Sequence, residues 1–263
     1  MKSSCGNMIQ NKSLFFSDRY RVLSGSGLKI LAMVTMVIDH VDLVFLRYQS
    51  EFITPLCTWG GKNITAYFLL RCVGRLSFPL FAFLLVEGFQ HTSNRRKYAR
   101  NLLVFAFVSE IPFDLMRFGE ISALEQNVFF TLFLGILALF AISRWEKGCA
   151  ILPCHSESGH LNGQLAICLF SLIGASMLIH TDYGSKGVCF IILLYVLRHS
   201  PVIQAAVGCL FLPWGWITGL AFIPINLYNG KRGFIQGAVA KYFFYAFYPL
   251  HMIAIYFIKC YLL

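Results

Sequence analysis

The sequence predicts an all-α polytopic membrane protein with about nine transmembrane helices and a polar cavity inside the helix bundle. Two observations support this fold class. The 263 residues are 57% hydrophobic and only 13% charged, whereas soluble domains carry about 25% charged residues. Apolar stretches close to the roughly 20 residues that a spanning helix requires also recur along the whole chain. This composition excludes a soluble enzyme held by a single anchor.

The chain is expected to divide into a short tail and one membrane domain. Residues 1–27 are polar, basic and lack the continuous apolar core of a signal peptide, which predicts a cytoplasmic N-terminal tail. Residues 28–263 form the transmembrane domain. The expected spans lie at about 28–46, 65–89, 101–118, 127–143, 164–180, 186–197, 202–212, 215–228 and 242–262.

Each span is recognised by its apolar run and by the polar segment that follows it. The second span contains LLRCVGRLSFPLFAFLLVEGF, and the strongly basic segment 91–100 separates it from the third. A longer polar segment, 144–163, precedes the fifth span. The two stretches beside Pro213 are short, which favours tilted or re-entrant helices there. The run KYFFYAFYPLHMIAIYFI marks the last span.

The basic residues predict the orientation of the chain. The net charge is +10, but these residues lie in short segments between apolar spans, so the charge does not indicate a nucleic-acid partner. With nine spans the tail and the basic segments all fall on one side. The positive-inside rule places that side in the cytoplasm and leaves the C-terminus outside, whereas one span fewer would break the pattern.

The first span carries the residues most suggestive of chemistry. Lys29, Met33, Met36 and His40 recur at helical spacing, so they share one face, with Lys29 and His40 about 16 Å apart along the axis. A histidine within a membrane span is costly and is usually functional. Asp39 lies about 100° around the helix from His40, so a cation from another helix is its expected partner.

Further ionisable residues lie inside the other spans. Arg71 and Arg75 stand one turn apart, either as an anion clamp or as partners that neutralise buried carboxylates, and both roles are compatible. Pro112 interrupts the third span and predicts a kink. The residues expected to line a cavity that opens outward are Arg71, Arg75, Glu110, Asp114, Asp182, Tyr183 and His251. A basic mouth is expected to face the cytoplasm.

The cysteines indicate packing rather than cross-linking. Nine are scattered along the chain and no CxxC motif occurs, which does not fit a disulfide framework. Cys149, Cys154, His155 and His160 form the one cluster with metal-ligating side chains. It has no second cysteine pair, so no metal is expected.

Seven ordered blocks resemble the TraX family. They are SGSGLKILAMVTMVIDH, RCVGRLSFPLFAFLLVEGFQHT, NRRKYARNLL, SEIPFDL, NVFFTLFLG, DYGSKGV and KYFFYAFYPLH. The resemblance implies a multi-pass acetyltransferase of the bacterial cytoplasmic (inner) membrane that uses acetyl-CoA, with pilin N-terminal acetylation in conjugation as the activity of the family's named member. The chain is also distantly similar to larger membrane acyltransferases with an Arg-x10-His pattern, which is Lys29-x10-His40 here.

The resemblance also implies roles for the residues. Acetyl-CoA would enter from the cytoplasm, with its phosphates held by Lys29 and by Arg95, Arg96, Lys97 and Arg100. His40, with Asp39, would be catalytic, either as general base or as a transient carrier of the acetyl group. Arg71 and Arg75 would orient Asp39 or stabilise the developing oxyanion. The acceptor, an amine or hydroxyl of a pilin-like peptide, a glycan or the cell wall, would come from the outer side.

Two other classes of function fit the composition. A secondary transporter would use the buried charges as a proton relay, although the sequence shows no internal repeat. A non-catalytic membrane scaffold would need the same charges only for folding.

Overall fold

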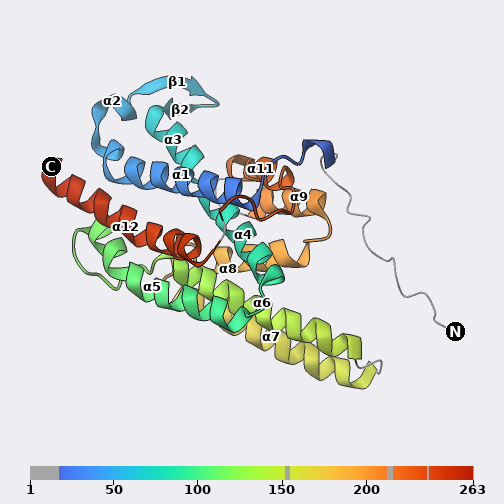
Figure 1. Cartoon of the computed structure of the whole chain (residues 1–263). Coiled ribbons are helices and arrows are strands. Elements are labelled where there is room, and N and C mark those ends of the chain that lie inside the picture. Colours follow the sequence, from blue (N-terminus) through green and yellow to red (C-terminus); the bar gives the residue numbers. More distant parts are fainter. Residues whose placement is uncertain (1–17, 152–154, 212–215, 236, 263) are drawn as a thin grey trace.

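The computed structural model describes residues 18–151, 155–211, 216–235 and 237–262, and most of these residues are helical (Figure 1). The first half contains α1 (Gly25–Val44), α2 (Ser50–Ile53), β1 (Pro55–Trp59), β2 (Lys62–Thr65), α3 (Ala66–Gly74), α4 (Ser77–His91) and α5 (Arg95–Phe118). The second half contains α6 (Val128–Ile151), α7 (His155–Leu178), α8 (Gly184–Val196), α9 (Pro201–Phe211), α10 (Trp216–Gly219), α11 (Phe222–Asn226) and α12 (Ala238–Leu262). The described part of the chain is therefore almost entirely α-helical.

The helices have the apolar character of a membrane protein. Among the described residues, the stretches long and apolar enough to cross a bilayer are Ala66–His91, Val128–Gly148 and Tyr242–Leu262. Several shorter apolar helices accompany them, namely Asn162–Leu178, Gly184–Val196, Pro201–Phe211 and Ile217–Asn226. A helix occurs at each position where the sequence predicts a span. The number of spans and the cytoplasmic tail stay predictions.

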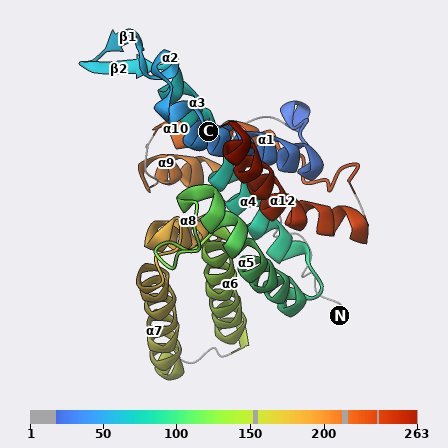
Figure 2. The same ribbon diagram turned by 90° about the vertical axis from the view of Figure 1, so that its left-hand side faces the viewer.

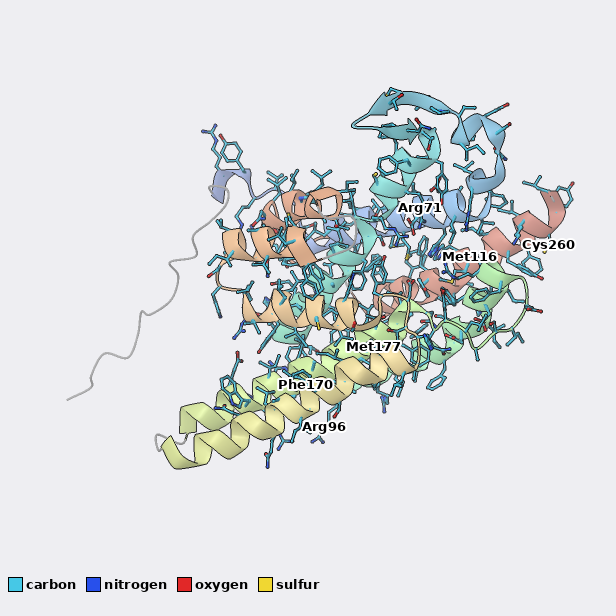
Figure 3. The ribbon with its side chains drawn as sticks, turned by 180° about the vertical axis from the view of Figure 1, so that it is seen from behind. Arg71, Arg96, Met116, Phe170, Met177 and Cys260 are labelled. Atoms are coloured by element: carbon cyan, nitrogen blue, oxygen red, sulfur yellow. The ribbon has the colours of Figure 1, made fainter. Side chains whose placement is uncertain are left out.

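Large apolar side chains lie on the outside of the bundle. Phe107 and Val108 on α5 are exposed, and so are Phe170 and Met177 on α7 (Figure 3). Exposed apolar surface of this extent is unfavourable in water and favourable in lipid. Contact with lipid accounts for the exposure of these apolar side chains.

Different elements lie at the two ends of the helix bundle. In Figure 1 the start of α1, the end of α6 and the start of α7 lie towards one end, while the hairpin of β1 and β2 and the end of α12 lie towards the other.

The hairpin is an element that the apolar pattern does not predict. β1 and β2 pair antiparallel with Trp59 opposite Lys62. Gly60 and Gly61 form the turn between them with φ of 58° and 75°, backbone angles that glycine adopts without strain and that match the twist of a hairpin. The hairpin projects away from the helices (Figure 2).

The expected second span is two helices rather than one. α3 ends at Gly74 and α4 begins at Ser77. Pro79 lies in the first turn of α4, where its missing N–H cannot bond the carbonyl of Arg75. The helix is therefore interrupted beside Arg75.

α1 lies at the centre and packs against α3, α4 and α12. Its contact with α3 is very close, because a Cβ atom at Gly74 would lie only 2.5 Å from the Cβ of Asp39. Arg71 of α3 lies in the same contact (Figure 3). Its Nη1 is 2.8 Å from Asp39 Oδ1 and its Nε is 3.8 Å from Asp42 Oδ2. The expected cation partner of Asp39 is thus Arg71.

Replacing Arg71 with Met should destabilise the protein strongly. Asp42 is completely buried and its carboxylate oxygens have no hydrogen-bond partner among the described residues, so Arg71 is the charge that compensates it. Removing one partner of a buried ion pair costs about 3–5 kcal/mol. Thermal unfolding in detergent should show a clear loss, whereas Arg100→Met at an exposed position should not. Equal unfolding midpoints would contradict this account.

Candidate functional site

A cavity of about 330 Å³ lies among α1, α4, α5, α6 and α12. Lys29, Met33, Met36 and His40 all line it, which confirms that they share one face of α1. Lys29 is half-buried, and its Nζ lies 5.1 Å from the ring centroid of Phe244. The cavity therefore runs along α1 from a lysine at one end to a histidine further in.

His40 pairs with His251 of α12. Nδ1 of His40 lies 2.7 Å from Nε2 of His251. The two rings are almost parallel, with an interplanar angle of 6° and centroids 5.0 Å apart. His251 does not line the cavity itself but stands behind His40. The ring of Phe247 also stacks on His251, with centroids 5.1 Å apart, so the ring of His251 contacts both His40 and Phe247.

The bonds of His251 determine the tautomers of both rings. Nδ1 of His251 lies 2.8 Å from the carbonyl oxygen of Phe247, which can only accept, so this nitrogen carries a proton. In a neutral ring Nε2 of His251 is then an acceptor, and His40 must donate to it from Nδ1. Nε2 of His40 keeps its lone pair. The pair thus presents a basic nitrogen rather than an N–H.

A group of charged residues lies further along the cavity. Arg71, Arg75, Asp182 and Tyr183 line it together with Asp39, so these predicted residues come together. Arg75 interacts with Tyr183 and with Asp182. The turn before α8 brings Tyr183 here, and its ring stacks on Phe78 with centroids 3.7 Å apart.

Glu110 and Asp114 differ from the expectation, because they are not in the lining of the cavity. Oε2 of Glu110 accepts hydrogen bonds from both the side-chain amide and the backbone N–H of Asn127. Asp114 accepts from the backbone N–H of Ser122 at 3.1 Å. Both carboxylates therefore fasten the connection between α5 and α6. In the sequence both residues are simply carboxylates within an apolar helix, and this pattern is the same for a structural carboxylate as for one that lines a cavity.

The basic residues 95–100 begin α5 rather than form a loop. Asn94 caps the helix by accepting from the N–H of Lys97. Arg95 donates to the carbonyl of Phe89 at 3.1 Å and to Ser143 Oγ at 2.8 Å. Arg96, Lys97 and Arg100 are exposed and stand outside the cavity lining.

Sequence reasoning missed two cations that line the cavity. Arg117 lies at the end of α5 and pairs with Glu125 at 2.6 Å. Arg232 belongs to the segment before α12 and lines the cavity together with Lys29. Arg117 stands at the very end of the expected span 101–118 and Arg232 lies between two spans, so neither is recognisable from the sequence as a charge buried deep in a span. For Arg232, the Lys-Arg-Gly sequence between two spans was the only local hint.

The side chains of the predicted cluster, Cys149, Cys154, His155 and His160, lie outside the part of the chain that the structure describes.

The comparisons with known proteins identify relatives. The chain matches the family described as TraX protein over residues 24–259. It is 31% identical over 258 residues to the probable fimbrial assembly protein FimC, serogroup H1, of Dichelobacter nodosus, covering 87% of this chain and 93% of that protein. No solved structure matches the chain.

Proposed function

The chain belongs to the TraX family, and from this premise we propose that it is a membrane acetyltransferase that moves an acetyl group from acetyl-CoA to a pilin-related acceptor. The observation that carries the proposal is the histidine pair. His40, whose Nε2 keeps its lone pair, lines a cavity that also contains cations suited to an anionic donor. A general base and an anion site are what acyl transfer from a thioester requires.

His40 acts as the general base in this proposal. Its Nε2 accepts a proton from the acceptor amine or hydroxyl as that nucleophile attacks the thioester carbonyl. The carbon–sulfur bond then breaks, and the departing thiolate takes the proton back from His40. His251 stabilises the transient imidazolium by accepting from Nδ1 of His40. Asp39 is a positioning residue that holds Arg71, and Arg75 is placed to stabilise the developing oxyanion.

The size of the cavity fits part of the donor. Small-ligand sites commonly enclose about 300–1,000 Å³, so a cavity of about 330 Å³ suits the narrow acetyl-pantetheine arm and not the complete donor. Lys29 would then lie beside the phosphates outside the narrow part. The exposed cations Arg96, Lys97 and Arg100 would attract the polyanionic donor to the same face.

The acceptor is proposed from the relatives. FimC of Dichelobacter nodosus is named a probable fimbrial assembly protein, which favours the terminal amine of a pilin-like polypeptide over a glycan or a cell-wall amine. The acceptor would approach from the end of the cavity at Asp182 and Tyr183. The protein would work as a multi-pass protein of the bacterial cytoplasmic membrane, with its N-terminus in the cytoplasm.

Replacing His40 with Ala should lower acetyl transfer by about 10²- to 10⁴-fold, the usual contribution of a general base. The protein is reconstituted in proteoliposomes with radiolabelled acetyl-CoA and the pilin fraction of its host, and labelled pilin is counted. His199→Ala at an exposed turn is the matched control. Full transfer by the His40 variant would exclude the mechanism. Uptake of substrate without consumption of acetyl-CoA would instead favour a transporter.

Two changes at His251 should separate tautomer control from packing. Gln can present an acceptor oxygen where Nε2 of His251 stands, so His251→Gln should keep most of the transfer rate. Phe fills the same space but accepts no hydrogen bond, so His251→Phe should lower kcat by roughly tenfold or more while the KM for acetyl-CoA stays unchanged. Equal rates for the two variants would show that His251 serves only packing.

Thiol labelling should test the proposed orientation. Cys57 is an exposed cysteine in the hairpin, which the nine-span topology places outside. An impermeant maleimide should label it in intact spheroplasts, and Cys57→Ser measures the background. An Arg96→Cys variant made in the Cys57→Ser protein should react only in inverted vesicles. Labelling of both positions from the same side would contradict the topology.

A further inference from the structure

The segment that precedes α12 is bound to the start of α1. We call residues 227–235 the strap. Backbone N–H groups of Leu23 and Ser26 donate to the carbonyls of Leu227 and Arg232, each at 3.0 Å. The N–H of Asn229 donates back to the carbonyl of Leu23 at 2.8 Å. The strap and the first turn of α1 therefore form one unit, although about 200 residues separate them in sequence.

Gly233 allows this close approach. Its φ is +88°, and a Cβ atom there would lie 2.5 Å from Ser24 Oγ and 2.6 Å from Ser26 Oγ. Ser26 Oγ donates to the carbonyl of Arg232 at 3.0 Å and accepts from the N–H of Ile235 at 2.9 Å. Ser26 thus binds the strap both at Arg232 and at Ile235, which fixes the backbone around Arg232.

This attachment brings two cations to one end of the cavity. Ser26, which binds the backbone of Arg232, is three residues before Lys29, and both basic side chains line the cavity. Their charges repel each other. Among the described residues neither forms an ion pair with a carboxylate. The carboxylates in the lining, Asp39 and Asp182, lie beside Arg71 and Arg75 further along.

Two adjacent cations without a carboxylate match a ligand with at least two negative charges. Arginine offers a planar pair of donors to phosphate oxygens, while lysine acts as a point charge. A diphosphate satisfies both groups at once. Lys29 also marks the end of the stripe that leads to His40, so a ligand held here by its diphosphate would extend towards the histidine pair.

We infer that Arg232 and Lys29 form a two-cation site for the diphosphate of the acyl donor, with Arg232 held in place by the strap. The inference rests on the proposed function and names a residue from outside the apolar spans as part of the donor site. It assigns the phosphates to the junction of α1 and the strap. Arg95 is committed to Phe89 and Ser143, and the other α5 cations stay outside the lining.

The test compares binding of acetyl-CoA with binding of acetyl-pantetheine, which has no phosphates. Full-length protein in detergent is titrated by calorimetry at about 0.15 M salt, where the Debye length of about 8 Å limits long-range attraction. Arg232→Ala and Lys29→Ala should each weaken acetyl-CoA binding about tenfold or more, the effect of losing one charge-assisted bond. Binding of acetyl-pantetheine should not change, and Arg232→Lys should be intermediate.

Lys231→Ala is the matched control, because it removes the same charge from the neighbouring exposed position outside the cavity lining. Equal weakening by Lys231→Ala and Arg232→Ala would mean general electrostatic attraction and would overturn the site. Tight binding of acetyl-CoA by the Arg232 variant would overturn it too, while the proposed function would stand. No binding of acetyl-CoA by the folded unmodified protein would remove the donor itself and with it both proposals.

Discussion

The structure depends on how α1 is held by two neighbouring side chains that point in different directions. Successive residues on a helix point about 100° apart, so Asp39 and His40 cannot serve the same partner. Asp39 binds Arg71 of α3, and His40 binds His251 of α12. The ion pair sets the rotation of α1, and this rotation turns His40 towards α12. The ion pair on one side of α1 therefore fixes the position of His40 in the histidine pair on the other side.

The opposite end of α1 is fixed by backbone bonds rather than by charge. The strap supplies carbonyls to the N–H groups of Gly25 and Ser26, which have no partner within the helix because they belong to its first turn. A helix held at both ends keeps a constant distance between Lys29 and His40. That distance sets the length that a bound molecule needs in order to contact both Lys29 and His40.

Sequence reasoning predicted the helices and the face of α1 because apolar runs and helical periodicity are local signals. It failed where contacts outside a single helix, or a local turn or helix break, decide the structure. Glu110 and Asp114 have the same signal as a catalytic carboxylate, and only the fold reveals that Asn127 and Ser122 bind them. Arg232 reaches the cavity through bonds to residues about 200 positions earlier. The hairpin depends on two glycines in a segment that has no apolar run. The break beside Arg75 depends on one proline within an otherwise continuous apolar stretch.

The hydrogen-bonded chain from His40 through His251 ends at the carbonyl of Phe247. A carbonyl oxygen accepts a hydrogen bond but does not carry a proton onward, unlike a carboxylate or a water chain. A proton that binds the histidine pair at Nε2 of His40 can therefore leave only from the same nitrogen. In the proposed acetyl transfer, each turnover would balance its protons within the cavity. The proposed reaction would therefore be independent of the membrane's proton gradient, although its site lies among apolar helices.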